Sequence, residues 1–504
     1  MLTNEKYNGI FLSTDSQFAG HLKIAGADSI IKLIGRDFLT SSGAESLDIH
    51  GMLDNGKKAS LLKCINYSTA RRVIDGNSHF ESVFFPHYVV VGEELISSDE
   101  PVIQAIHYHF DNVKCLLSGC ETFQTLYPEV DEIRHVFDCE HKRREEIAEK
   151  YGWSKSPRKL QIGEHPQLLY FSGLWEIISS ESKAGKISLT NRSSSGMGGA
   201  AGVAIKNEVT ANIEFKKPNT LDEAIEVLSS LHSLFELILG RRQLFGWIEL
   251  ELTHRSKESE SDLPQRAQLY WSLCNKRVDK ESETNLNDVL ISLEQHPEEF
   301  SKIVTNWMNS MDSMGEPRGR FGTAFAGNYS VDRIVGAANM FDLLPGTHVP
   351  RAKEIDASLQ DAVKQCRKIF KDLSDSFAKQ SILSALGRIG KASLRDKVYF
   401  RADKVIAASD GRFQELTIPC HHAVLARNHY VHGSASAFNY QSHLTEFAFI
   451  IDTLEFVFAV SDLLDLGWDL KRWMDKGTSM THPFGAYLIN YSQNIERLKV
   501  LVDK

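Results

Sequence analysis

Residues 425–433, LARNHYVHG, place an arginine, an asparagine and two histidines in one short stretch. Because imidazole exchanges a proton near neutral pH, His432 could take the proton of a ribose 2′-hydroxyl or return one to a departing 5′-oxygen. Arg427 could neutralise charge that builds on the phosphate, and Asn428 could orient either group through a hydrogen bond. These residue types suit metal-independent cleavage of RNA, which leaves a 2′,3′-cyclic phosphate and requires the 2′-hydroxyl that DNA lacks.

One helix is expected to position these side chains. Thr417 is its predicted N-cap, Pro419 falls in its first turn, and Gly433 ends it. At roughly 100° per residue, Arg427 lies about 140° around the helix from His432. The pair can meet on one phosphate only through the long reach of arginine or through a second copy of the helix in a symmetric dimer.

The simpler interpretation is that Arg427 and His432 form the polar end of an ordinary helix. Arginine five residues before histidine is a common chance spacing, and spacing alone favours contacts with backbone carbonyls and carboxylates. The role of His429 is also undecided at this point, since it could be a second acid or base or a polar surface residue. The rest of the sequence has to decide between a catalytic pair and an ordinary helix end.

The chain of 504 residues is long enough for two or three domains, and its 42% hydrophobic and 24% charged residues are typical of a soluble globular protein. Its start lacks the pattern of a signal peptide. The most apolar stretch, 447–466, carries four acidic residues and predicts a buried helix rather than a membrane span. Seven cysteines without a disulfide framework favour a reducing compartment, expected to be the cytoplasm.

Charge is distributed unevenly along the chain. The formal net charge is −9, yet residues 351–504 hold 21 Lys and Arg against 18 Asp and Glu. The C-terminal part is therefore the better candidate to meet a polyanion. Four basic residues on a helix predicted beside the motif could contact RNA phosphates, although a solvated basic face would look the same. They are Lys391, Arg395, Lys397 and Arg401.

Apolar and polar residues alternate in short runs through the first 130 residues and again over 185–196, 207–219 and 244–252, which predicts antiparallel strands. A charged helix over 132–151 and an apolar helix over 221–239 interrupt this pattern. Thr220 and Gly240 are the expected caps of the second helix. Residues 1–255 are therefore predicted to be a β-rich, sandwich-like sensor or regulatory domain with added helices.

A helical period replaces the alternation after a polar segment at 254–265. Residues 256–330 are predicted to form a helical connector, and residues 331–504 an all-α bundle of five or six helices. The predicted fold class is α+β.

Histidines and cysteines recur between residues 107 and 141 and could supply zinc ligands, but no Cys-x-x-Cys knuckle is present. We therefore predict no metal; the residues concerned are His107, His109, Cys115, Cys120, His135, Cys139 and His141. We expect the side chains of the CHH run at 420–422 to be packed or solvated rather than to act on the same phosphate as His432. The glycine-rich run at 193–202 lacks the Lys-Ser/Thr of a phosphate-binding loop, so a surface loop is expected.

The run Arg427-Asn-His-Tyr-Val-His432, followed by glycine on an inner helix of a C-terminal bundle, resembles the HEPN superfamily signature Arg-x(4 to 6)-His. Over most of the chain, FAGHL, FFPHYVVVGE and YFSGLWEII resemble the ApeA family of bacterial anti-phage abortive-infection proteins. The resemblance implies a HEPN ribonuclease, inactive until infection, with Arg427 and His432 catalytic and Asn428 supporting. His429 departs from the small or hydrophobic residue usual at its position.

We therefore expect an endoribonuclease that needs no cofactor and acts as a homodimer or higher symmetric oligomer away from membranes. Its substrate is RNA, with tRNA one candidate, and a phage protein is a candidate trigger. Two alternatives stay open. The bundle could be a non-catalytic HEPN module that binds nucleotide or a partner, or the β-rich region could be a carbohydrate or peptide receptor that the bundle only dimerises.

Overall fold

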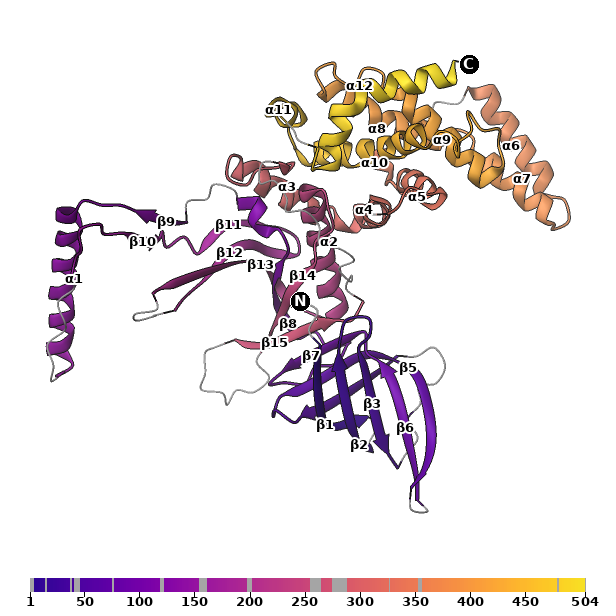
Figure 1. Ribbon diagram of the computed structural model, residues 1–504. Coiled ribbons are helices and arrows are strands. Elements are labelled where there is room, and N and C mark those ends of the chain that lie inside the picture. The colour runs from indigo at the N-terminus through magenta and orange to yellow at the C-terminus, as the bar shows by residue number, and fades with distance from the viewer. Residues whose placement is uncertain are drawn as a thin grey trace. The chain divides into compact units, whose positions relative to one another are not determined.

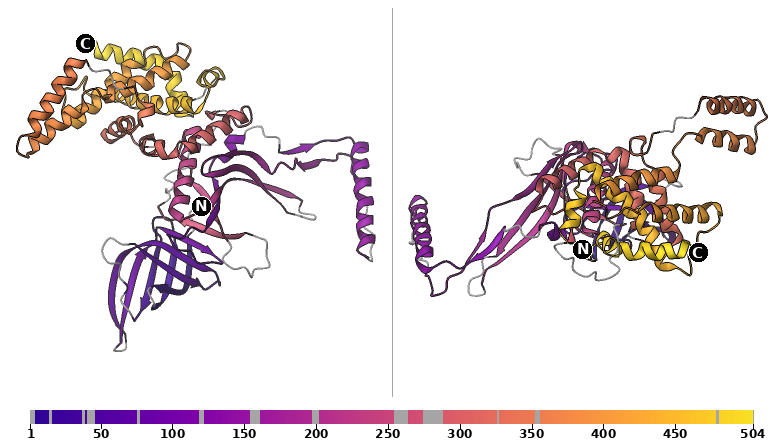
Figure 2. Two further views of the ribbon diagram at one scale, coloured as in Figure 1. Left: turned by 180° about the vertical axis from the view of Figure 1, so that it is seen from behind. Right: turned by 90° about the horizontal axis from the view of Figure 1, so that it is seen from above.

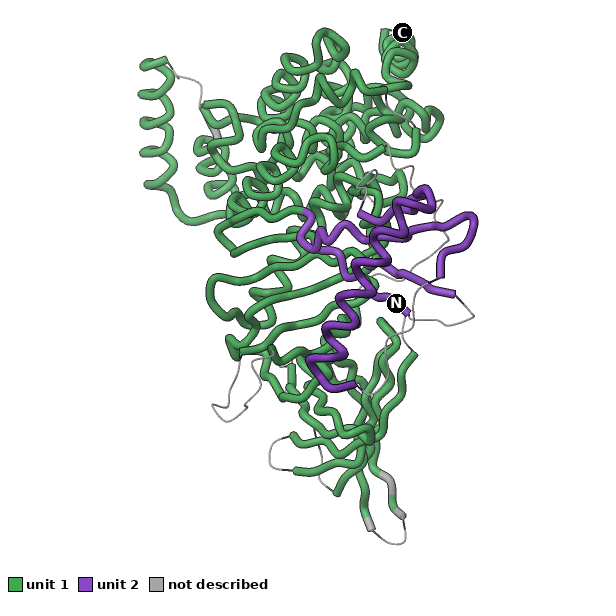
Figure 3. The backbone as a smooth tube through the Cα atoms, turned by 90° about the vertical axis from the view of Figure 1, so that its left-hand side faces the viewer, with its two compact units in different colours: residues 1–118, 178–189, 209–504 green, residues 119–177, 190–208 purple. Residues whose placement is uncertain are grey.

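The computed structural model describes most of the chain in two compact units (Figure 3). The first unit comprises residues 1–118, 178–189 and 209–504, and the second comprises 119–177 and 190–208. The described residues are 4–13, 16–36, 39, 46–74, 77–117, 122–153, 161–196, 202–253, 264–273, 288–325, 327–351, 356–477 and 480–503.

Six antiparallel strands at the N-terminus close into a barrel (Figure 1). They are β1 (Glu5–Ser13), β2 (Ser16–Ile24), β3 (Ile30–Gly35), β4 (Leu47–Leu53), β5 (Lys58–Ile74) and β6 (Asn77–Phe85). Their order is β5-β4-β1-β2-β3-β6, and β6 pairs back onto β5. Closure leaves this part of the sheet without a free edge.

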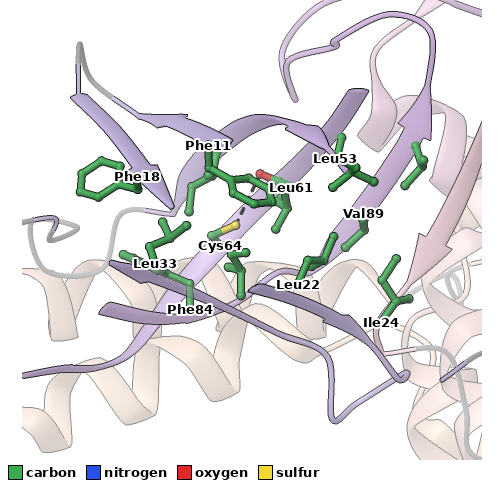
Figure 4. Close-up of a cluster of buried hydrophobic side chains, with 14 of the residues drawn as sticks. Phe11, Phe18, Leu22, Ile24, Leu33, Leu53, Leu61, Cys64, Phe84 and Val89 are labelled. Carbon is green, nitrogen blue, oxygen red and sulfur yellow. Dashed lines mark hydrogen bonds between the residues drawn. The ribbon is translucent and has the colours of Figure 1, made fainter. Parts of the chain in front are cut away.

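The barrel encloses its own apolar core (Figure 4). Alternate residues of each strand point inward, among them Phe11, Leu22 and Phe84, all with 0% exposure. The ring of Phe11 lies where Gly20 and Gly51 leave room, because a Cβ at either glycine would overlap it.

An open sheet continues from β5 in the order β7-β15-β14-β8-β13-β12-β11. Its strands are β7 (Tyr88–Gly92), β8 (Ile103–Phe110), β11 (Glu176–Glu181), β12 (Gly185–Gly196), β13 (Ala204–Asn219), β14 (Phe245–Leu252) and β15 (Gln265–Trp271). Helix α2 (Leu221–Leu239) packs on β8. Thr220 and Glu223 form a capping box at its start, and Gly240 ends it at φ 69°, as predicted.

The second unit contains a two-stranded antiparallel sheet of β9 (Phe123–Leu126) and β10 (Leu168–Phe171). It also contains α1 (Val130–Lys150), in which only Ile133 and Ala148 are buried. The predicted exposed charged helix is therefore confirmed.

Helices follow the open sheet. They are α3 (Pro297–Asn309), α4 (Met311–Phe325), α5 (Val331–Asp342), α6 (Ala357–Lys371), α7 (Phe377–Arg388), α8 (Leu394–Ala408), α9 (Thr417–His432), α10 (Leu444–Leu466), α11 (Leu470–Asp475) and α12 (Pro483–Val502). Short 3-10 helices lie at Val113–Leu117 and Gly346–His348. Helix α10 is the buried centre, against which α3, α4, α5, α8, α9 and α12 pack (Figure 1).

Arginines from neighbouring helices pair with three acidic residues of α10. The pairs are Arg318 with Asp462, Arg333 with Glu455, and Arg401 with Asp465. The prediction of a buried helix over 447–466 is thereby confirmed. None of the helices that the structure describes combines the length and the apolar character needed to cross a lipid bilayer.

The α+β fold class is confirmed, with two differences in the strand-rich region. The predicted sandwich is instead a closed barrel joined to an open sheet, because β6 pairs with both β3 and β5. Strand β15 pairs with β14 and β7 although it follows the predicted boundary at residue 255. The strand-rich region therefore extends to Trp271.

Candidate active site

The end of α9 carries the motif. The helix begins at Thr417 and ends at His432, where Gly433 takes φ 70° and its N–H bonds to the carbonyl of His429 at 2.9 Å. Leu416, rather than the predicted Thr417, precedes the first helical residue and caps nothing with its side chain. The buried middle of α9 anchors the helix, whereas its last turn reaches solvent.

Arg427 and His432 meet within one chain. An Nη1–H of Arg427 donates to Nε2 of His432 at 3.0 Å and to Oδ1 of Asn428 at 3.2 Å. The long arginine side chain therefore spans the angle between the two positions, so no second helix is needed to bring the pair together. Because a guanidinium only donates, this contact is a hydrogen bond in the tautomer that carries its proton on Nδ1 and accepts at Nε2.

Asp342, the last residue of α5, holds Arg427 from the other side. Its Oδ2 lies 3.5 Å from Nη2 of Arg427. Nζ of Lys397 on α8 donates to the Asp342 backbone carbonyl at 3.0 Å and to Oδ1 at 3.4 Å. Arg427 and Lys397 are each 16% exposed, and Asp342 is 39% exposed. Asp342 could not be predicted from the sequence, since only the packing of α5 on α8 and α9 brings it to the motif.

His429 faces the loop that follows α9. Its Nδ1–H donates to the carbonyl of Ser434 at 2.6 Å, and its ring lies 5.7 Å from that of Tyr440. The hydroxyl of Ser434 donates in turn to the carbonyl of Asn428. Through these contacts His429 helps to order the loop. Its role as a second acid or base stays a prediction.

One predicted RNA-binding residue cannot reach RNA. Arg401 is fully buried, where it donates to Ser461 at 2.8 Å and to Asp465 at 2.5 Å. Burial alone would raise the pKa of Asp465, but hydrogen bonds and charge from His348, Arg401 and Lys404 hold that pKa below its usual value. The prediction that Arg401 contacts RNA is therefore wrong, because its guanidinium completes an ion pair inside the bundle.

The other three predicted RNA-binding residues occupy different positions. Lys391 and Arg395 are exposed around the start of α8, and Arg395 lies over the ring of Tyr399 at 5.0 Å. Lys397 instead belongs to the Asp342 network, close to Arg427. The basic surface near the motif thus divides into exposed cations and one cation within the site.

The histidines and cysteines considered as zinc ligands are dispersed. His107 contacts Asn212 and Glu251, and His109 contacts the carbonyl of Val209. The described members fall into different units, and Cys120 lies outside the described residues. No three His, Cys, Asp or Glu side chains gather as a metal cluster anywhere in the described ranges.

The described residues of the two remaining runs occupy other positions. Burial lowers the pKa values of His421 and His422 and raises that of Cys420, which are the effects expected of packed side chains. Residues 193–196 of the glycine-rich run end strand β12, and residues 197–201 lie outside the described residues.

Comparison with protein families identifies both halves of the chain. Residues 6–159 and 175–307 match the ApeA N-terminal domain 1, and residues 335–472 match the Apea-like HEPN domain. Searches of curated proteins and of solved structures gave no match.

A strand-rich N-terminal region followed by a HEPN bundle defines a HEPN-containing defence protein. The N-terminal match alone spans more than half of the sequence. The chain belongs to the ApeA family, and the resemblance noted in the sequence is confirmed.

Proposed function

We propose that the protein is a metal-independent HEPN endoribonuclease of anti-phage defence, which stops growth by cleaving RNA. The observation that carries this proposal is the contact between Arg427 and Nε2 of His432 at the exposed end of α9. It places a permanent positive charge beside an imidazole that can exchange a proton, and cleavage of a phosphodiester needs both groups.

The proposed reaction uses the 2′-hydroxyl of the RNA as nucleophile. Nε2 of His432 accepts its proton while the 2′-oxygen bonds to phosphorus and the 5′-oxygen departs with a proton from the resulting imidazolium or from water. Arg427 turns its Nη1 donor from His432 to a phosphate oxygen and stabilises the added charge. The products are a 2′,3′-cyclic phosphate and a 5′-hydroxyl.

Asp342 and Asn428 are proposed positioning residues. Asp342 holds Nη2 of Arg427, so that Nη1 stays free to choose between His432 and the phosphate. Asn428 accepts from the same Nη1 without adding charge. Lys397, held by Asp342, provides a second cation within reach of the same phosphate region.

The remaining parts of the proposal concern regulation. The N-terminal strand-rich region would sense a phage protein, and tRNA is a candidate substrate. Direct contacts join helix α2 of the strand-rich region to the helical part of the chain. The Trp307 indole donates to the Ser230 carbonyl of α2 at 2.9 Å, and His482 bonds to the Leu237 carbonyl at 3.2 Å. The described free cysteines fit a cytoplasmic location.

The test is RNA cleavage by the purified chain in EDTA, with wild type compared with Arg427→Ala and His432→Ala. We expect both variants to fold as wild type and to lose at least about a hundredfold in rate. His421→Ala, on the same helix away from the pair, is the matched control and should stay active.

The products and one modified substrate sharpen the test. Ends should carry a 2′,3′-cyclic phosphate, and a single 2′-deoxy substitution at the cleaved position should block the reaction. Equal rates for wild type, Arg427→Ala and His432→Ala, or cleavage of the deoxy substrate, would reject the proposal.

A non-catalytic HEPN module is the second candidate. The observation that favours it is the ion pair between Asp342 and Arg427, which already satisfies part of the arginine's charge. Such a module would bind nucleotide or RNA with an affinity that Arg427→Ala weakens, yet it would release no cyclic phosphate. A receptor dimerised by its bundle would show neither property.

A further inference from the structure

Helices α6 and α7 expose many of their apolar side chains to water. No side chain of α6 is buried, and neither is any α7 side chain that the structure describes. Leu359 is 48% exposed, Ile369 61% and Phe377 89%. The two helices lie side by side and pack on one another (Figures 1 and 2). So much apolar surface on one small element is typical of an interaction site.

Apolar residues form one stripe on each helix, and all of them are exposed except Cys366, which is half-buried. Along α6 they recur at alternating spacings of three and four residues, at Leu359, Ala362, Cys366, Ile369 and, just past the helix end, Leu373. Along α7 the same alternation gives Ala378, Ile382, Ala385 and Ile389. Such a repeat keeps its members on one side of a helix and marks a seam for another helix.

The hairpin keeps its shape without using these stripes. Nζ of Lys379 donates to the carbonyls of Lys371 and Leu373, and Arg367 donates to the carbonyl of Leu386. A separate set of apolar residues is half-buried within the hairpin, namely Val363, Phe370, Leu383 and Leu386. The two stripes are therefore available for a partner.

We propose that this partner is the hairpin of a second chain, so that two copies form an antiparallel four-helix bundle. Two helices cannot enclose a core, whereas four can, and the matching repeat on each helix suits self-association about a twofold axis. The proposal names the interface of the homodimer that the sequence leads us to expect, and it does not depend on catalysis.

Charge along α6 supports an antiparallel copy. The acidic residues Asp356 and Asp361 lie at its start, whereas basic residues concentrate towards its end. The basic residues are Lys364, Arg367, Lys368 and Lys371. An antiparallel copy sets each acidic end beside a basic end. RNA would satisfy the basic residues but would leave both apolar stripes exposed.

The test is the mass of the full-length protein in solution at about 10 μM, by light scattering on a sizing column. Wild type should have twice the mass of the 56.7 kDa chain. Ile369→Glu combined with Ile382→Glu should be monomeric, with a dimer dissociation constant raised at least about a hundredfold, because two charges would enter each seam. Its circular dichroism should match that of wild type.

Ile489→Glu combined with Val500→Glu is the matched control, since these α12 residues are 50% and 60% exposed on another surface. This control should remain a dimer, and so should Arg427→Ala, which separates assembly from catalysis. A monomeric wild type, a dimer that survives the stripe substitutions, or a dimer lost in the α12 control would overturn the proposal.

Cys366 supplies a second readout, because it lies at the middle of the α6 stripe and is a free thiol. With the twofold axis there, oxidation by copper phenanthroline should join two chains through this residue. The covalent dimer should vanish in Cys366→Ser and persist in Cys139→Ser. A wild-type dimer that forms no Cys366 link would overturn the antiparallel pairing of α6.

Discussion

The guanidinium of Arg427 donates to Nε2 of His432 over 3.0 Å, although the two positions lie about 140° apart around α9. An Nε2 atom that accepts from Arg427 becomes free to accept a proton once the arginine turns to a phosphate. Asp342 fixes the remaining end of the guanidinium. The predictions for the site follow from these contacts among Asp342, Arg427 and His432.

Arg427→Lys should separate the contribution of positive charge to catalysis from that of side-chain geometry. Lysine keeps the positive charge but lacks the planar fork that contacts Asp342 and His432 together. We expect kcat for RNA cleavage to fall about a hundredfold, with an unchanged melting temperature. Single-turnover kinetics measures this effect, and activity equal to wild type would show that charge alone suffices.

Asp342→Asn should impair catalysis without weakening substrate binding. Losing the carboxylate frees Arg427 and Lys397 to rotate, so kcat should fall by about tenfold or more. KM should stay level or fall, because a negative charge near the phosphate is removed. Asp312→Asn, an exposed carboxylate on α4, is the control. A raised KM with unchanged kcat would contradict a positioning role.

Arg395→Glu and Lys391→Glu should weaken RNA binding. Both residues are exposed, and removing one cation that binds a phosphate should lower the slope of log affinity against log salt by about one. Fluorescence anisotropy over a salt series measures the slope. Lys216→Glu on β13 makes the same charge change elsewhere and should leave binding unaltered. A similar weakening with Lys216→Glu would indicate a general effect of net charge.

Asp462→Ala should strongly destabilise the bundle. The side chains of Asp462 and Arg318 are only 2% and 4% exposed, so the substitution leaves an unpaired buried guanidinium. Arg318 also lies over the Trp307 ring at 3.8 Å, which fixes it in place. We expect the free energy of unfolding to fall by about 3–5 kcal/mol in urea denaturation. Asp312→Ala, at an exposed site, should change it little, and equal effects would contradict the role of burial.

Stability should decline as pH falls below about 6.5, in part through His482. Burial lowers the pKa of His482 to about 3. Its neutral ring bonds to the carbonyl of Leu237 and accepts from the N–H of Phe484. Because the unfolded chain takes up a proton at higher pH than the folded chain, folding loses about 3 kcal/mol from this group by pH 4.

His482→Gln should flatten part of that pH profile, which urea denaturation at a series of pH values measures. His21→Gln, on the outer face of the barrel, should keep the wild-type profile. A profile unchanged by His482→Gln would mean that other groups, such as the buried His232, account for the acid sensitivity.

Sequence alone determined the local elements that carry the site. Pro419 lies in the first turn of α9 and Gly433 ends it, as predicted, although Leu416 rather than Thr417 is the N-cap. Thr220 and Gly240 place both ends of α2, because capping involves residues only a few positions apart. The motif predicted HEPN membership for the same reason, since its members lie within one helix.

Tertiary structure decided how distant segments meet. Pairing of β6 with β5 closes the barrel, packing of α5 on α9 brings Asp342 to Arg427, and a carboxylate of α10 draws Arg401 into the core. Local sequence shows that Asp342 is acidic and Arg401 basic, but not which is exposed. Burial and ion pairing depend on which segments pack together, and only the folded chain fixes that choice.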